Sequence, residues 1–360
     1  MSNDVKDYQQ QLLQAIQSFN GSASLMEVCG THTMAIAKSG IRGLLPPNIK
    51  LLSGPGCPVC VTSQGDIDAV ILMVQQKDLI LVTFGDMMRV PGTYSSLQEE
   101  RSQGADIRVA YSPLDALRVA RENPQKEVVF LGIGFETTTP TIAITLEQAV
   151  KEGLKNFSVF SLHKVVPPAL ELIFSDTDIK VDGLICPGHV SAVIGVKPYE
   201  ILTDKYKKPC VITGFETQDI LEGIYMLLQQ LKKDEARVEI QYGRVVKPEG
   251  NPIARQTMER VFKPAAARWR GLGMIPASGL ELREEYAGMD TRLKFGIPEI
   301  EELPIKGCAC GEVLTGKISP PDCALFGRAC TPLKPVGPCM VSHEGSCAAF
   351  YRYTPVKGRG

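Results

Sequence analysis

Short and almost uninterrupted apolar runs recur through the middle of this chain, and they constrain its fold more than any other feature. The runs lie at residues 78–86, 126–136, 156–164, 181–190 and 208–216. Runs of this length are typical of strands buried on both faces, as in parallel sheets. Helical segments lie between them, and the one after the second run opens with Thr139 and Pro140 and closes at Gly153. The alternation predicts an α/β fold with parallel sheets.

The chain of 360 residues is longer than one hydrophobic core normally accommodates. The four residues Gly-Phe-Glu-Thr occur at 134–137 and again at 214–217, each time after an apolar run and before a helical segment. This repeat favours two related α/β lobes. From about residue 245 the pattern changes to Pro, Gly and Cys with few apolar runs, so the C-terminal segment needs something other than side-chain packing to hold it together.

The charge and hydropathy of the chain exclude several classes of protein. The net charge is −1, so there is no broad positive field to hold nucleic acid or an anionic membrane. Residues 1–19 lack the pattern of a signal peptide and instead show one apolar helix face. The apolar runs are also too short to span a membrane. We expect a soluble, cytoplasmic protein that binds neither nucleic acid nor membrane.

The chain has 11 cysteines, and a reducing compartment disfavours structural disulfides. Metal ligation or redox chemistry is therefore the better explanation. The cysteines are unevenly distributed, at positions 29, 57 and 60, then 186 and 210, then 308, 310, 323, 330, 339 and 347.

Cys57 and Cys60 stand in a Gly/Pro loop that follows an expected strand at 49–53. Ser63 and Asp66 form a capping pair, so a helix should begin directly after this loop. The positive end of that helix favours thiolates and should lower the thiol pKa values, which suits reversible disulfide formation. The alternatives are a tight turn with two incidental thiols, or half of a zinc site, although the sequence has no second C-x-x-C to complete one.

Cys29 and His32 lie at the start of a short helix that should end at Gly40. A soft thiolate with a nearby imidazole suits iron, copper or zinc. The alternative is a buried cysteine beside a surface histidine.

The six C-terminal cysteines occur within about forty residues that are rich in Pro and Gly. An iron–sulfur cluster takes four thiolates and needs no histidine or carboxylate. Structural zinc is the competing metal, but its ligands usually come in pairs at short spacing, which this segment lacks. The pattern favours a cluster over zinc.

Three further residues stand in turns between strand and helix, where open α/β sheets bind ligands. They are Glu136, Cys186 and His189. The alternative for each is local capping or turn formation. Neither a dinucleotide-binding glycine pattern nor a P-loop occurs in the sequence.

Several of these segments together resemble the HypD family of nickel–iron hydrogenase maturation factors. The resemblance covers residues from about 25 to 353, and its motifs occur in order along the chain. They are EVCGTHTMAI (27–36), LLSGPGCPVCVT (51–62), GFETTTPT (134–141), PGHVSAVIG (187–195) and the run Cys308-x14-Cys323-x6-Cys330-x16-Cys347.

The resemblance implies a scaffold and redox factor for assembly of an Fe(CN)2CO group. In this family the protein acts with HypC and receives cyanide from HypE, and the finished iron group, a transient cargo, passes to the hydrogenase large-subunit precursor. By resemblance, Cys29 binds the iron with His32 beside it, and Cys57 and Cys60 form a redox dithiol. A 4Fe–4S cluster would be held by Cys308, Cys323, Cys330 and Cys347, which leaves Cys310 and Cys339 without an assigned role.

The family fold implies two α/β lobes and a third, cysteine-rich domain that carries the cluster and is formed from both chain ends. The expected bounds are 45–125 for the first lobe with the C-x-x-C loop, 126–240 for the second, and 1–44 with 241–360 for the third domain. Two other functions stay open, a thiol–disulfide oxidoreductase and a metal-stapled adaptor in metallocentre assembly. Whether such a scaffold is an enzyme also stays open.

Overall fold

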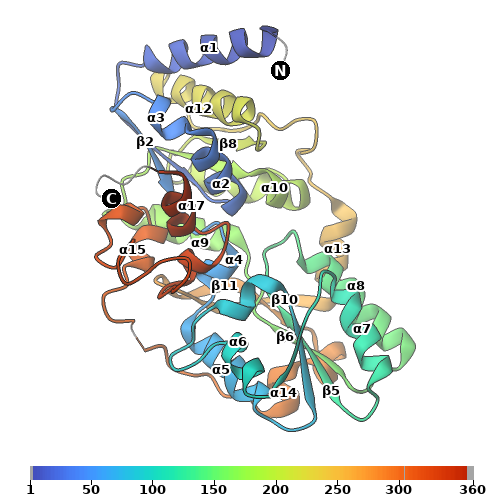
Figure 1. The fold of residues 1–360 in the computed structure, drawn as a ribbon. Coiled ribbons are helices and arrows are strands. Elements are labelled where there is room, and N and C mark those ends of the chain that lie inside the picture. Colours follow the sequence, from blue (N-terminus) through green and yellow to red (C-terminus); the bar gives the residue numbers. More distant parts are fainter. Residues whose placement is uncertain (1–2, 304, 355–360) are drawn as a thin grey trace.

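The computed structural model describes residues 3–303 and 305–354 (Figure 1). Its larger sheet is parallel throughout, and the strands in spatial order are β2 (Ile49–Ser53), β1 (Ala23–Glu27), β7 (Gly183–Pro187), β8 (Cys210–Thr213) and β9 (Val238–Ile240). The second sheet is also parallel, and its order is β4 (Asp106–Val109), β3 (Leu79–Thr83), β5 (Glu127–Gly132) and β6 (Phe157–Ser161). The predicted α/β fold with parallel sheets is confirmed.

Helices connect the strands and cover the sheets. The first, α1 (Asn3–Gln17), packs on α12 (Thr217–Lys232) at the outer side of the five-stranded sheet. The others up to β9 are α2 (Gly30–Ser39), α3 (Ile41–Leu44), α4 (Pro58–Val61), α5 (Gln64–Val74), α6 (Leu97–Ser102), α7 (Pro113–Glu122), α8 (Thr139–Glu152), α9 (Val166–Ser175), α10 (Gly188–Ile194) and α11 (Glu200–Asp204). None of the helices in the described part of the chain is long and apolar enough to cross a membrane.

The C-terminal third contains a hairpin and short helices. The helix α13 (Pro252–Val261) packs on α8 and leads into an antiparallel pair, β10 (Phe262–Trp269) and β11 (Gly273–Leu282). The remaining helices are α14 (Thr291–Phe295), α15 (Cys310–Leu314), α16 (Pro338–Val341) and α17 (Ser346–Tyr353). Short 3-10 helices lie at Gly85–Arg89, Lys197–Tyr199, Glu284–Met289 and Pro320–Asp322.

Local signals in the sequence place several helix ends correctly. Ser63 caps α5, and its hydroxyl accepts from the amide of Asp66. Gly40 and Gly153 adopt left-handed conformations, with φ of 71° and 68°, directly after α2 and α8. The N-cap of α8 is Thr138, one residue earlier than expected. These ends depend on contacts between near neighbours, which is why the sequence predicts them.

The strand order crosses the bounds expected for the lobes. β4 precedes the division at 125/126 and β5 follows it, yet both strands pair with β3. The N-terminal strand β1, expected in the third domain, is a central strand of the five-stranded sheet. The chain therefore starts one sheet, completes the other, and returns to the first with β7. The Cys-rich C-terminal segment is present as expected, and its last helix, α17, packs on α2.

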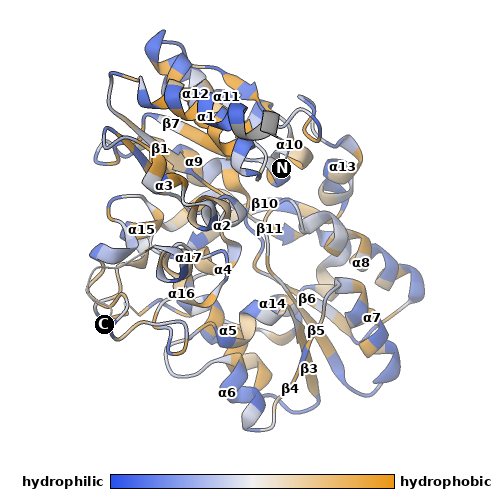
Figure 2. Cartoon of the chain, turned by 45° about the horizontal axis from the view of Figure 1, so that its top comes forward, coloured by the Kyte–Doolittle hydropathy of each residue, from blue (hydrophilic) through white to orange (hydrophobic). Residues whose placement is uncertain are grey.

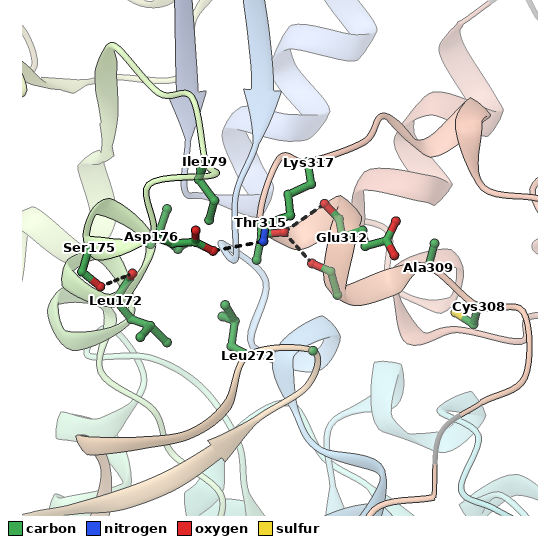
Figure 3. A pocket seen from close by; sticks show the side chains of 13 residues that line it. Leu172, Ser175, Asp176, Ile179, Leu272, Cys308, Ala309, Glu312, Thr315 and Lys317 are labelled. Carbon is green, nitrogen blue, oxygen red and sulfur yellow. Dashed lines mark hydrogen bonds and ion pairs between the residues drawn. The ribbon is translucent and has the colours of Figure 1, made fainter.

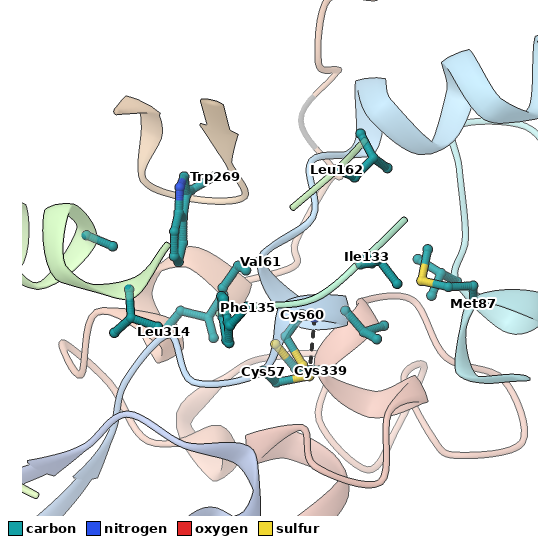
Figure 4. Close-up of a cluster of buried hydrophobic side chains, with 14 of the residues drawn as sticks. Cys57, Cys60, Val61, Met87, Ile133, Phe135, Leu162, Trp269, Leu314 and Cys339 are labelled. Atoms are coloured by element: carbon teal, nitrogen blue, oxygen red, sulfur yellow. Dashed lines mark hydrogen bonds between the residues drawn. The ribbon is translucent and has the colours of Figure 1, made fainter. Parts of the chain in front are cut away.

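Most cysteines lie inside the hydrophobic core. The largest cluster of buried side chains includes both members of the C-x-x-C pair and four of the six C-terminal cysteines, together with Phe135 and Trp269 (Figure 4). Figure 2 shows the apolar strands at the centre of both sheets and polar residues gathered on outer helices such as α6 and α7. The core thus joins the second sheet, the hairpin and the C-terminal segment around the thiols.

Candidate functional site

The loops that carry Cys29 and Cys57 are fastened to each other. They follow β1 and β2, two neighbouring parallel strands in which Glu27 is opposite Ser53, so both loops leave the sheet at the same edge. Beyond the strands, the amide of Gly54 donates to the carbonyl of Glu27 over 2.7 Å. The amide of Gly30 then donates to the carbonyl of Gly56 over 2.9 Å. These two bonds hold the backbone before Cys57 against the backbone of Cys29.

This close approach requires glycine in the GPGC loop. A Cβ atom on Gly56 would lie 2.1 Å from the amide nitrogen and 2.5 Å from the Cα of Cys29. A Cβ atom on Gly54 would lie 2.6 Å from a methyl carbon of Val28. Side-chain atoms do not approach backbone this closely without a shift of the chain. The glycines of the motif therefore permit contact between two cysteine loops, and this contact could not be read from the motif itself.

Cys29 lies at the start of α2, as expected, and is its N-cap, but its thiol is not activated by this position. The residue is 9% exposed, and its backbone amide donates to Oε2 of Glu27 over 3.1 Å. Burial raises the pKa of the Cys29 thiol to about 12, and the backbone N–H of His32 opposes this only in part. Desolvation outweighs the helix end here. A thiolate at this position therefore needs a cation beside it, such as a metal ion.

Glu27 is a site residue that sequence reasoning missed. Its carboxylate is fully buried, accepts from the hydroxyl of Thr33 over 2.6 Å and contacts the Cys29 amide. Burial raises its pKa to about 7, although the Thr33 hydroxyl, the Cys29 amide and the charge of Arg42 lower it. The signal available in the sequence was a carboxylate at the end of a largely apolar strand. Glu27 orients the first turn of α2 through two of its residues.

His32 is buried, and the alternative of a surface histidine is wrong. Its Nε2 lies 2.9 Å from the carbonyl of Gly214 and 2.9 Å from the hydroxyl of Thr213. Because a carbonyl only accepts, the proton sits on Nε2, and the Nδ1 lone pair has no hydrogen-bond partner among the described residues. Burial lowers the His32 pKa to about 4, so the ring is neutral at physiological pH.

The second Gly-Phe-Glu-Thr segment supports this histidine. The ring of Phe215 lies 4.6 Å from that of His32 and 4.1 Å from that of His189, measured between centroids. His189, expected as a site candidate in a turn, is thus placed one ring away from His32. The five-stranded sheet therefore brings the loops after β1, β7 and β8 together, as expected at the carboxyl ends of parallel strands.

Cys57 and Cys60 form one turn. Cys57 is the N-cap of the short helix α4, and its sulfur accepts from the backbone amide of Cys60 over 3.4 Å. Both residues are buried, at 4% and 0% exposure. Burial raises the pKa of the Cys60 thiol well above its ordinary value, so the expected lowering by the helix end is wrong for this residue. The Cys60 side chain is shielded from water and faces protein groups instead.

All six C-terminal cysteines line one small cavity. Its other lining residues are apolar or glycine, and no histidine or carboxylate contributes. The sulfurs of Cys310 and Cys339 are 2.8 Å apart, and the amide of Val336 donates to the sulfur of Cys330 over 3.3 Å. The cysteines that the cluster prediction left without a role are therefore paired with each other. The other four are Cys308, Cys323, Cys330 and Cys347.

A continuous series of thiols joins the C-x-x-C pair to this cavity. The backbone amide of Cys60 donates to the sulfur of Cys57, and the Cys60 and Cys339 side chains lie close enough for their thiols to interact (Figure 4). The sulfur of Cys339 is 2.8 Å from that of Cys310, and the Cys310 thiol lies close enough to Cys308 to interact with it. We call these five residues, Cys57, Cys60, Cys339, Cys310 and Cys308, the thiol series. Residues separated by more than 240 positions in the sequence thus contact each other directly.

The donor set fits an iron–sulfur group better than a single ion. No three His, Cys, Asp or Glu side chains within the described ranges are arranged to hold one metal ion. A cluster places its irons between the thiolates, so its ligands stand farther apart than those of one ion. A cavity lined by six thiols as its only metal-binding side chains, with an amide donating to one sulfur, matches the donor chemistry of such clusters.

Cys308 also borders a second, open cavity of about 460 Å³ (Figure 3). This cavity lies between the end of α9, the turn of the β10–β11 hairpin and α15, and Lys317 forms an ion pair with Asp176 across it at 3.0 Å. Cys308 is partly exposed, whereas Cys310 is buried. The cysteine group is thus reached from the solvent on the Cys308 side.

The remaining expected positions lie apart from these contacts. Cys186 and Cys210 are buried on the adjacent strands β7 and β8, and the Cys210 thiol donates to the carbonyl of Lys208 over 3.6 Å. Glu136 is buried, and its Oε1 accepts from the amide of Val166 at the start of α9 over 2.9 Å. Burial raises the Glu136 pKa to about 7, and its Oε2 has no hydrogen-bond partner in the described part of the chain.

Comparisons with known proteins agree with this organisation. The chain matches the HypD family model, described as the hydrogenase formation hypA family, over residues 4–354. It is 46% identical over 336 residues to the hydrogenase maturation factor HypD of Rhodobacter capsulatus, covering 91% of this chain and 89% of the relative. It is 45% identical over 330 residues to HypD of Escherichia coli K12, with 91% and 88% covered. It is 47% identical over 336 residues to the hydrogenase expression/formation protein HupD of Azotobacter chroococcum, with 91% and 89% covered.

Fold, site and comparisons together define a cysteine-rich hydrogenase maturation factor. Within that class, the chain belongs to the HypD family.

Proposed function

We propose that this protein is the scaffold and redox factor on which the Fe(CN)2CO group of nickel–iron hydrogenase is assembled. The observation that carries the proposal is the arrangement of three cysteine groups in one continuous region. The Cys29 loop is fastened to the loop that leads into Cys57, and the thiol series extends from Cys57 to Cys308. The scaffold function requires these cysteines to lie in one region, and the contacts between their loops support it.

In this proposal Cys29 binds the iron substrate through its thiolate. Cyanide and CO favour low-spin ferrous iron, for which a soft thiolate is a suitable partner. The chain disfavours a free thiolate by burial, so the charge of the incoming iron drives the loss of the Cys29 proton. His32 is held neutral by the loop after β8, with its Nδ1 lone pair unpartnered among the described residues. It supplies an acceptor beside the site rather than a second positive charge.

The C-terminal cysteines Cys308, Cys323, Cys330 and Cys347 would hold a 4Fe–4S cluster, which supplies single electrons when bound. Cys57 and Cys60 form a dithiol whose sulfurs are close enough along one helical turn to interconvert with a disulfide. Cys339 and Cys310 lie between that dithiol and the cluster ligands. The arrangement provides a route for electrons within one chain toward the loop of Cys29.

The partners follow from the same proposal. HypC would share the iron at Cys29, HypE would deliver cyanide, and the hydrogenase large-subunit precursor would receive the finished group. The cytoplasm is the compartment that keeps such thiols reduced.

An infrared experiment tests this function. The protein is purified without oxygen after co-expression with HypC, and the cyanide and CO stretching regions are recorded beside iron and sulfide analysis. We expect two cyanide bands and one CO band in the wild type, all lost in Cys29→Ala while the cluster irons remain. A cluster without diatomic bands, in a preparation shown to contain bound HypC, would contradict the scaffold.

A thiol–disulfide oxidoreductase is the second candidate, and the thiol series is the observation that favours it. That function gives Cys29 no task, so Cys29→Ala would leave dithiol turnover intact. The third candidate is a metal-stapled adaptor. The dithiol has no role in that function, so replacing Cys57 or Cys60 with serine would leave it intact.

A further inference from the structure

Arg270 lies in the turn of the β10–β11 hairpin and holds the end of the C-x-x-C helix. Its backbone amide donates to the carbonyl of Val61 over 2.8 Å, and its Nε donates to the carbonyl of Thr62 over 2.8 Å. These two residues end α4 and directly follow Cys60. Arg270 is only 5% exposed. The side chain therefore reaches inward from the hairpin to the dithiol turn.

The same turn also packs on the helix that begins with Cys310. A Cβ atom on Gly271 would lie 2.1 Å from the Cα of Gly311, so the two backbones touch. Gly271, Gly311 and Cys308 line the same open cavity. Arg270 thus stands between α4, which carries the dithiol, and α15, which follows Cys308. Consistent with this position, Arg270 lies close enough to Cys308 and Cys310 for its charge to act on both thiols.

The guanidinium of Arg270 has no anionic partner among the described residues. It takes part in no ion pair with a carboxylate there, and its Nη2 is buried without a hydrogen-bond partner. Burial of an unpaired charge is costly, because a guanidinium cannot escape the cost by losing its proton. The residue that follows Arg270 touches the residue that follows Cys310, so the side chain stands beside the start of the cysteine-bearing helix α15. Such a charge indicates that an anion belongs on that side of the side chain.

We propose that Arg270 is the counter-charge of the anionic metal–thiolate group held by the C-terminal cysteines, and that it positions this group beside the dithiol turn. The inference rests on the proposed function, since it presupposes a cluster at these cysteines. Four thiolates around a cluster give a net negative charge that increases on reduction. A fixed positive charge therefore stabilises the reduced state more than the oxidised state, and it raises the reduction potential.

Three variants separate charge from structure. Arg270→Met removes the charge and the Nε bond to Thr62 but keeps a long apolar side chain. Arg270→Lys loses that bond and keeps the charge. Arg268→Met, two residues earlier on β10, removes an arginine that lines a different cavity and serves as the matched control. Each protein is reconstituted anaerobically with iron and sulfide, and its cluster potential is measured by titration monitored by electron paramagnetic resonance.

We expect wild type, Arg270→Lys and Arg268→Met to titrate together. In Arg270→Met the reduction potential of the cluster should be more negative by at least about 59 mV. For one electron, this is a tenfold change in the ratio of oxidised to reduced cluster. Thermal unfolding gives a second readout with the opposite sign in the two forms. Without cluster, Arg270→Met should unfold no earlier than wild type, since an unpaired buried charge is gone. Binding of the cluster should raise the unfolding temperature of Arg270→Met by fewer degrees than it raises that of wild type.

Three results would overturn the inference. If wild type takes up about four irons and four sulfides per chain but Arg270→Met titrates like wild type, the counter-charge is wrong and the proposed cofactor stands. Equal destabilisation of Arg270→Met with and without cluster would identify a purely structural arginine. If the wild-type chain takes up no iron and sulfide at all, the proposed cofactor fails and the inference falls with it.

Discussion

The backbone amide of Gly30 donates to the carbonyl of Gly56 over 2.9 Å, and this bond joins the two loops that carry the first three cysteines of the chain. The loops follow neighbouring parallel strands, so the sheet itself delivers them to the same edge. The bond explains why the GPGC motif has glycine directly before Cys57. Any side chain there would occupy the space of the Cys29 backbone.

Gly56→Ala should therefore disrupt the site. The added Cβ would lie 2.1 Å from the Cys29 amide nitrogen, and backbone atoms cannot move aside as a flexible side chain can. We expect a loss of about 2 kcal/mol or more in the free energy of unfolding, as for an overpacked core, with loss of iron binding at Cys29. Gly43→Ala is the control, because nothing lies within 4 Å of its added Cβ and the residue is helical. Equal denaturant midpoints for the two variants would disprove the steric argument.

Cys57→Ser and Cys60→Ser distinguish the scaffold from an adaptor. If the dithiol carries electrons to the Cys29 loop, each single variant should reduce hydrogenase maturation to the level of a strain without this protein. Iron and sulfide content should stay at the wild-type level, since the predicted cluster ligands are untouched. Hydrogenase activity after complementation measures the effect, and Cys210→Ser, on β8, controls for the loss of a buried thiol. Full complementation by both dithiol variants would favour the adaptor.

Cys339→Ala should interrupt the thiol series at its middle. The sulfur of Cys339 lies 2.8 Å from that of Cys310, and its side chain lies close enough to Cys60 for the two thiols to interact. With dithionite as the electron donor, we expect reduction of a Cys57–Cys60 disulfide to slow at least tenfold in the variant, whereas iron and sulfide content stay unchanged. Timed alkylation and mass spectrometry report the rate. Cys186→Ala, a buried thiol on β7, provides the comparison, and a Cys339→Ala rate equal to that of wild type would remove Cys339 from the route.

Glu136→Gln should change how stability depends on pH. Burial raises the Glu136 pKa from 4.5 to about 7, so this carboxyl stabilises the fold below pH 4.5, and that contribution is lost as the pH rises through 7. Glutamine keeps an oxygen for the Val166 amide and carries no charge. Relative to wild type, the variant should gain up to about 3 kcal/mol between pH 4.5 and pH 8.

Glu152→Gln provides the sign control for that experiment. The hydrogen bond from Arg121 lowers the Glu152 pKa from 4.5 to about 2. The stability that the ionised Glu152 carboxylate contributes is therefore present above pH 4.5 and is lost as the pH falls toward 2. The two variants should therefore change stability in opposite directions with pH in urea titrations. A flat difference between Glu136→Gln and wild type across this range would show that the Glu136 carboxyl is not desolvated.

The sequence by itself determined the features that depend on near neighbours. Five apolar runs became the strands β3, β5, β6, β7 and β8, because a continuous apolar run is buried on both faces of a parallel sheet. The Ser63 cap and the Gly40 end of α2 depend on contacts within one turn. The motifs around Cys29 and Cys57 also identified the family, since their order and spacing are properties of the chain alone.

Only the tertiary structure decided which segments meet. The pairing of β5 with β3, the contact of Cys60 with Cys339 and the position of Arg270 join residues far apart in the sequence, and no local pattern encodes such distances. Burial was equally invisible, so the expected lowering of the Cys60 pKa by a helix end had the wrong sign. Removing a thiolate from water costs more free energy than the positive end of a short helix provides in stabilisation. How far a thiol is removed from water depends on the packing of the whole molecule.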